Sequence, residues 1–114
     1  MKNNRRLGAD YEKAAADYLA GKGYDIFERN YRSRWGEIDI IAKDGDRIVF
    51  AEVKYRSNGD LSSALEAVDS SKQRQIRNMA KMYLAKNRLY DVPCRFDVIA
   101  LAGGRILHIE NAFE

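Results

Sequence analysis

The chain has 114 residues, 46% of them hydrophobic and 32% charged, which excludes a disordered or collagen-like protein and predicts one domain over residues 1–114. A single cysteine, Cys94, excludes a disulfide framework within the chain and a cysteine-based zinc cluster. The net charge of +3 is too small to identify a partner, and no apolar run reaches the roughly 20 residues that a membrane-spanning helix needs. We therefore expect no membrane partner and, without an apolar segment after the basic start, a cytoplasmic location.

The first half of the chain predicts one helix followed by three extended segments. Apolar residues recur every three or four positions over residues 4–19, which predicts a helix that ends near Gly21 and Gly23. Residues 24–32 are predicted to be extended. The β-branched runs at 37–42 and 47–54 flank an Asp-Gly pair, which predicts a hairpin with Asp44-Gly45 as its two-residue turn.

The second half predicts a second long helix and two more strands. A short helical turn near residues 64–68 precedes a helix over 70–86, with Ser70 as its N-cap and Gln73 closing a capping box. Strands are predicted over 95–101 and 105–109, after Pro93. This order of elements predicts an α/β fold in which helices cover a mixed sheet.

Three acids and a lysine share one face of the predicted hairpin: Glu37, Asp39, Glu52 and Lys54. In the predicted register Asp39 lies opposite Phe50 and diagonal to Glu52, with Cα atoms about 7–8 Å apart. Carboxylates at this spacing can close on one Mg²⁺ ion, and a neighbouring ammonium group suits hydrolysis of a phosphodiester. Ordinary ion pairs at an exposed strand end would use the same residues.

A basic block follows the hairpin. Residues 70–90 hold six basic and no acidic residues, against 14 basic and 17 acidic residues elsewhere. Arg74, Arg77, Lys81 and Arg88 share one side of the predicted helix, which indicates either a surface for a polyanion or a solvated helix face. Lys72 falls on the apolar side, so it either extends past the core edge or points toward the hairpin acids.

Two further positions have two interpretations each. Glu12 lies at the margin of the apolar stripe of the first helix, where it would supply another carboxylate or remain solvated. Arg34 and Trp35 precede the first hairpin strand. An arginine beside an aromatic residue can grip phosphate and stack on bases, whereas a tryptophan in a surface loop can also cover a core edge.

Two segments of the hairpin resemble the signature of the YraN-like family of small bacterial proteins, namely residues 36–42 (GEIDIIA) and 49–56 (VFAEVKYR). Residues 95–99 (RFDVI) and 108–113 (HIENAF) also resemble that family. The family is similar to the PD-(D/E)xK nucleases, whose restriction-endonuclease-like fold includes archaeal Holliday-junction resolvases. The resemblance implies an α/β fold with a mixed central β-sheet flanked by helices, and a metal site at one sheet edge.

Residue by residue, the resemblance implies that Asp39 and Glu52 bind Mg²⁺ or Mn²⁺, with Glu12 as a further acid in the metal site. Lys54 matches the lysine of the ExK half, and Lys72 matches a basic residue that some members carry on the following helix. Ile38 stands where the superfamily name has proline.

A single nuclease-like domain acting on DNA is therefore the leading hypothesis, with branched or structured DNA as the substrate class. The residues expected to hold the phosphate backbone are Arg34, Arg56, Arg74, Arg77 and Lys81. A junction with two scissile strands would suit two symmetric copies, so a homodimer is one open assembly. The alternatives are a nucleic-acid-binding module with little activity and a protein-interaction scaffold.

Overall fold

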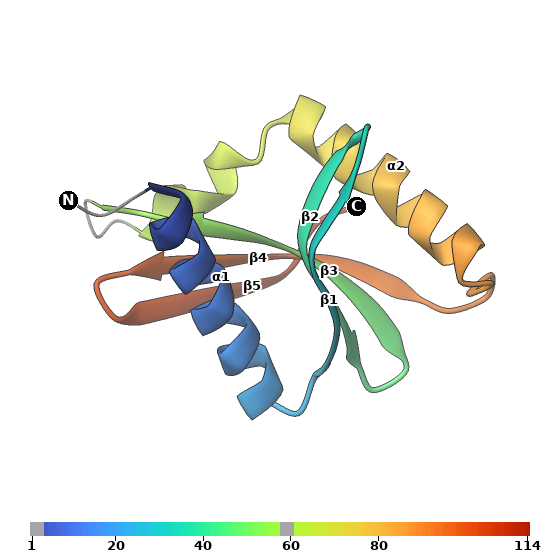
Figure 1. The fold of residues 1–114 in the computed structure, drawn as a ribbon, viewed down its shortest axis with the longest axis horizontal. Coiled ribbons are helices and arrows are strands. Elements are labelled where there is room, and N and C mark those ends of the chain that lie inside the picture. Colours follow the sequence, from blue (N-terminus) through green and yellow to red (C-terminus); the bar gives the residue numbers. More distant parts are fainter. Residues whose placement is uncertain (1–3, 58–60) are drawn as a thin grey trace.

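A five-stranded mixed sheet with two long helices forms the body of the protein (Figure 1). The computed structural model describes residues 4–57 and 61–114. The strands lie in the order β1-β2-β3-β4-β5, and only β3 and β4 pair in parallel. This is the α/β, restriction-endonuclease-like arrangement expected from the sequence. None of the helices in the described residues is long and apolar enough to cross a membrane.

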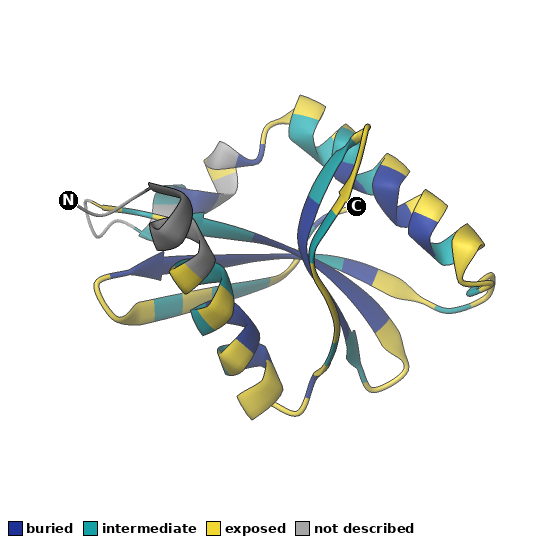
Figure 2. Cartoon of the chain, viewed as in Figure 1, coloured by how far each residue is buried: buried dark blue, intermediate teal, exposed yellow. Residues whose placement is uncertain are grey.

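The two helices cover opposite faces of the sheet. α1 (Asn4–Gly21) packs Ala15 and Leu19 against one set of alternating strand residues, and α2 (Ser70–Lys86) packs Ile76 and Met79 against the other set. Because successive strand side chains point to opposite faces, the alternation builds two separate cores. Figure 2 shows buried residues along the central strands and exposed residues at the hairpin turns.

The central hairpin consists of β2 (Gly36–Asp44) and β3 (Arg47–Tyr55), and its register differs from the prediction. Asp44 pairs with Arg47, so the turn is Gly45-Asp46 and Phe50 pairs with Ile41. The predicted Asp44-Gly45 turn, which set Asp39 opposite Phe50, is wrong. Gly45 has φ +62°, and glycine at the first turn position is what a type II′ hairpin requires.

The helical segments lie close to their predicted ranges. η1 (Leu61–Ala67) is a 3-10 helix, and α2 spans residues 70–86 as expected. The predicted N-cap, Ser70, is wrong. Asp69 caps α2, because its Oδ1 accepts the Lys72 amide at 2.8 Å and Ser70 already belongs to the helix.

The last two strands of the chain are longer than predicted, and the first extended segment is shifted by one residue. β1 (Asp25–Ser33) pairs with β2, and β4 (Cys94–Ala102) pairs with β5 (Arg105–Phe113). The sequence prediction ended the last strand four residues early. The pairing with β4 shifts between Phe96 and Val98, and Asn111 has φ +51°, so an irregularity carries the strand through a polar stretch.

Candidate functional site

The pairing of β2 and β3 stops just before the acids of the hairpin. Ile40 and Ala51 are the last paired residues, and Figure 1 shows the two strands diverging beyond them. Past this point the Val53 amide donates to Asp39 Oδ2 at 2.8 Å. The Asp39 carboxylate therefore accepts a hydrogen bond that a carbonyl of the partner strand would otherwise accept. Asp39 and Glu52, the first residues beyond the last pair, lie at the opening between the two strands.

Four acids and a lysine line a hollow of about 300 Å³ at this opening: Glu12, Glu37, Asp39, Glu52 and Lys72. We call it the acid hollow. One carboxylate oxygen each from Glu12, Glu37 and Asp39 lies within 4.8 Å of the others. Glu12 comes from α1 and the other two from β2, so helix and sheet both contribute. The rings of Tyr11 and Tyr55, stacked at 4.0 Å between centroids, also line it.

Glu52 is buried beside this triad, with 6% of its surface exposed. Its Oε1 lies 3.7 Å from Lys54 Nζ and its Oε2 lies 3.8 Å from Lys72 Nζ, both longer than a strong hydrogen bond. Within the described residues, Oε2 is a buried atom without a hydrogen-bond partner. Burial and the nearby charge of Asp39 raise the pKa of Glu52 to about 8, although Lys72 and Lys54 oppose the rise.

The acids crowd negative charge into a partly buried space. Burial, followed by the charges of Asp39 and Glu37, also raises the pKa of Glu12. Ligands on opposite sides of a Mg²⁺ ion are about 4.2 Å apart, because each Mg–O distance is about 2.1 Å. Three oxygens cannot all be opposite one another, so at least two of the three pairs must close from separations of up to 4.8 Å to the spacing of adjacent ligands, about 3.0 Å. The three carboxylate donors and their proximity therefore fit a divalent cation once the side chains close around it.

The structure brings the expected catalytic residues together and adds one. Glu12, Asp39, Glu52 and Lys72 all line the acid hollow, and Lys54 contacts Glu52 from outside its lining. Of the two interpretations of Lys72, the structure supports the one that points to the acids. Glu37 was not among the expected metal ligands. Its signal was visible in the sequence, since it shares the hairpin face with Asp39 two residues later.

The residues expected to hold phosphate divide into two groups. Arg34, Arg74 and Lys81 are exposed, and each lines a hollow that also contains Trp35. Arg56 instead donates from Nη2 to the Ser63 carbonyl at 3.1 Å, and Arg77 donates from Nη1 to the Glu114 carbonyl at 2.7 Å. These two guanidinium groups hold parts of the fold together.

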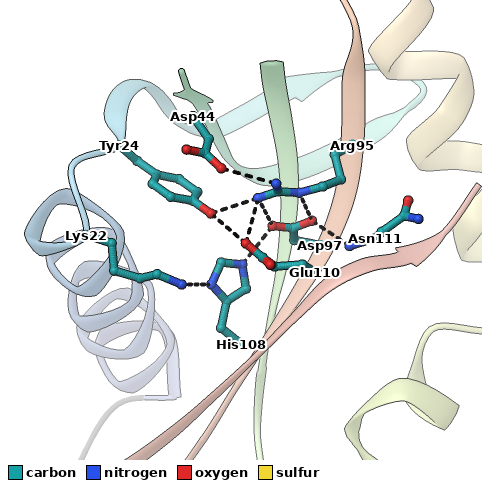
Figure 3. Close-up of polar contacts among 8 residues, drawn as sticks. All are labelled: Lys22, Tyr24, Asp44, Arg95, Asp97, His108, Glu110 and Asn111. Atoms are coloured by element: carbon teal, nitrogen blue, oxygen red, sulfur yellow. Dashed lines mark hydrogen bonds and ion pairs between the residues drawn. The ribbon is translucent and has the colours of Figure 1, made fainter. Parts of the chain in front are cut away.

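A second polar cluster lies near the start of β4 and centres on Asp97, which is completely buried (Figure 3). Arg95 donates to both of its oxygens at 2.9 Å. The Asn111 amide and His108 Nε2 also contact Asp97, at 3.0 and 2.7 Å. Burial alone would raise the pKa of Asp97, but the bonds from His108, Arg95 and Asn111 outweigh it and lower the pKa.

Partners from β2, β5 and the loop between α1 and β1 surround Arg95 and Asp97 of β4. Lys22 Nζ lies 2.9 Å from His108 Nδ1, and Tyr24 accepts from Arg95 at 2.7 Å. A lysine ammonium can only donate, so Nδ1 accepts and the Nε2 proton faces Asp97. Asp44 and Glu110 complete the charge balance at 3.2 and 3.4 Å from Arg95. The buried groups are mutually satisfied, which is typical of a structural network.

Comparison with protein families identifies the chain. A family model described as "Uncharacterised protein family UPF0102" matches residues 11–101. The chain belongs to this family. UPF0102 is the YraN-like family that the motifs resembled, and the match includes every residue of the acid hollow.

UPF0102 relatives match this chain over almost their whole lengths. A UPF0102 protein of Lachnoclostridium phytofermentans is 48% identical over 113 residues, covering 98% of this chain and 96% of the relative. One of Geobacter metallireducens is also 48% identical, over 98% of this chain and 95% of the relative. One of Clostridioides difficile is 49% identical, over 97% and 99%. Their names state no activity, so the functional argument depends on the site.

Proposed function

We propose that this protein is a metal-dependent nuclease that hydrolyses phosphodiester bonds in DNA. The observation that carries the proposal is the convergence of the Glu12, Glu37 and Asp39 carboxylates within 4.8 Å of one another. Beside them, Glu52 and two lysines supply further charged groups around the same hollow. Acids that bind a cation, next to ammonium groups that bind phosphate oxygens, are the groups that phosphodiester hydrolysis requires.

In this proposal Glu12, Glu37 and Asp39 hold Mg²⁺ or Mn²⁺, with Glu52 as the neighbouring acid. When bound, such a cation neutralises phosphate charge and lowers the pKa of water. The Val53 amide fixes the orientation of Asp39 by donating to Oδ2. A carboxylate held by the backbone presents a defined geometry, which reduces the cost of organising the site.

Lys54 and Lys72 act on the reacting phosphate. Both ammonium groups approach Glu52, at 3.7 and 3.8 Å, without a tight hydrogen bond to it. Each can therefore donate to a phosphate oxygen or to the attacking water. Lys54 orients the water, and Lys72, which lines the acid hollow from α2, stabilises the charge that develops on the phosphate.

Arg34, Arg74 and Lys81 hold the DNA backbone outside the acid hollow. Binding through such contacts weakens as salt rises, because each neutralised phosphate releases counterions. Branched or structured DNA as substrate, a homodimer that acts on two strands, and a cytoplasmic location remain the accompanying predictions.

The test is cleavage of labelled duplex, single-stranded and branched DNA in Mg²⁺ and in Mn²⁺. We expect at least one substrate to be cut by the wild type and not in EDTA. Asp39→Asn should lose activity, whereas Asp46→Asn, an exposed aspartate in the hairpin turn, should retain it. If no substrate is cut, or if Asp39→Asn cuts as fast as the wild type, the proposal is wrong.

A second candidate is a nucleic-acid-binding module with little activity. It is favoured by the position of Arg34, Arg74 and Lys81, which lie outside the lining of the acid hollow and need no metal to bind phosphate. DNA binding that is unaffected by EDTA, together with no cleavage in either metal, would support it.

A further inference from the structure

Trp35 is a large exposed aromatic side chain that the proposed chemistry does not use. It lies between β1 and β2, it is the only tryptophan of the chain, and 54% of its surface is exposed. A tryptophan that covered a core edge would be mostly buried, so the structure does not support that interpretation. Exposed rings of this size commonly mark binding surfaces.

The backbone at Trp35 is tied to α2. Gln75 Nε2 donates to the Trp35 carbonyl at 2.8 Å, and the Trp35 amide donates to Ser33 Oγ at 3.0 Å. Gly36 has φ +146°, and a side-chain carbon there would overlap the Gln75 side chain. The tight turn therefore requires glycine, and it fixes the backbone from which the Trp35 ring projects. A fixed backbone loses less conformational entropy when a ligand binds.

Trp35 belongs to a series of three hollows that share lining residues and begin at the acid hollow, and we call this series the trough. A second hollow, of about 400 Å³, shares Glu37 and Lys72 with the acid hollow. A third, of about 590 Å³ on the outer side of α2, shares Trp35 and Gln75 with the second. The ring thus stands where the second and third hollows meet, and the trough leads from the acids past Trp35 to the α2 surface.

The trough away from the acids is basic and partly apolar. The Arg34 guanidinium lies 4.7 Å from the centroid of the Trp35 ring, and Arg34 lines only the second hollow. Trp35 also lines the third hollow, which Arg34 does not. Arg74, Lys81 and the exposed Met82 line that hollow. Cations for phosphates beside a flat ring for a base match a nucleic-acid strand.

We propose that Trp35 stacks on an unpaired base of the DNA strand whose backbone follows Arg34, Arg74 and Lys81 toward the acid hollow. Bases inside a duplex are already stacked and paired, so only an unpaired base can offer its face to the ring. The Cα atoms of Trp35 and Glu37 are at most about 7 Å apart, because only Gly36 lies between them. The stacked base then lies within about two nucleotides of the bond to be cut, so the substrate is DNA with an unpaired nucleotide there.

This inference depends on the proposed nucleic-acid substrate, and it can be tested without cleavage. Trp35 is the only tryptophan in the sequence, so tryptophan fluorescence reports on it alone. The fluorescence is followed in EDTA while a single strand of about 12 thymidines is added. We expect quenching that saturates. A strand of the same length with abasic sites keeps the phosphates and should not quench, and a blunt duplex should quench far less.

Variants then separate stacking from simple loss of charge or fold. Trp35→Leu should raise the Kd for the labelled single strand about tenfold, and Trp35→Phe should restore most of the affinity because it keeps an aromatic face. Tyr90→Leu, at an aromatic residue with 73% of its surface exposed and outside the lining of the trough, is the matched control and should bind as the wild type does.

Three results would overturn the inference: equal quenching by the abasic strand, unchanged affinity in Trp35→Leu, or no binding of any oligonucleotide. The last result would leave the trough to a partner of another kind. If DNA is cleaved but the fluorescence of Trp35 does not change when the single strand is added, this inference is rejected and the proposed nuclease activity is not. Base-dependent quenching without cleavage in Mg²⁺ or Mn²⁺ would support it and reject only the nuclease activity.

Discussion

Replacing Glu52 by glutamine should stabilise the metal-free protein at neutral and alkaline pH. The pKa of Glu52 rises from 4.5 to about 8, chiefly because the carboxyl group is buried and next because Asp39 is close. Between these two pH values the folded protein keeps a proton that the unfolded chain has released. The free energy of unfolding therefore falls as the pH rises through this window.

The size of the effect follows from the pKa difference. Each pKa unit corresponds to about 1.4 kcal/mol, so full ionisation of Glu52 costs the folded state on the order of 5 kcal/mol. About 3 kcal/mol of this falls between pH 5 and pH 8. For a chain of this length we expect the Tm of the wild type to fall by about 10 °C over that range. Glu52→Gln cannot ionise and should lose most of this slope.

The assay is thermal unfolding in EDTA, followed by circular dichroism at several pH values between 5 and 9. Glu66→Gln changes an exposed glutamate and serves as the control, which should follow the wild-type curve. At pH 8 the Glu52→Gln variant should melt well above the wild type. If the wild-type Tm is constant between pH 5 and 8, or if both variants behave alike, Glu52 does not carry a raised pKa in the fold.

Two further predictions concern the metal site and the buried network. Mn²⁺ should raise the Tm of the wild type more at pH 8 than at pH 6, because protons compete with the ion for Glu12 and Glu52. It should have little effect on the Tm of Asp39→Asn, and a shift in that variant equal to the wild-type shift would place the ion elsewhere. Asp97→Asn should destabilise the fold by about 3–5 kcal/mol at pH 7, because it leaves Arg95 buried without its main partner, and a Tm within about 3 °C of the wild type would contradict this.

The sequence predicted the positions of the elements better than their local geometry. Periodicity placed α2, but whether Asp69 or Ser70 caps it depends on which side chain reaches the free amides, and both residues suit the role. The hairpin turn was misplaced because Asp44-Gly45 and Gly45-Asp46 are both plausible two-residue turns. The correct register moved each β3 partner by two positions, which keeps every side chain on its predicted face.

The members of the site were harder to predict than the fold. Glu37 joins the carboxylate triad where β2 and β3 diverge, and no local sequence pattern predicts where the pairing of these two strands ends. Arg56 was assigned to phosphate binding because it lies just beyond Lys54, and Arg77 because it lies on the basic side of the predicted helix. Their carbonyl partners, on Ser63 and Glu114, are brought to them by packing between segments, which charge patterning does not contain.

The most direct test of the metal-dependent hydrolysis site is the single-turnover rate of DNA cleavage as a function of Mn²⁺ concentration, compared between the wild type and Asp39→Asn. The wild-type rate should rise from zero in EDTA to a plateau, and Asp39→Asn should be slower by at least about 100-fold at every concentration, since about 3 kcal/mol of transition-state stabilisation is lost. Cleavage that persists in EDTA, or a plateau in Asp39→Asn equal to that of the wild type, would contradict the assignment of the acid hollow as the catalytic metal site.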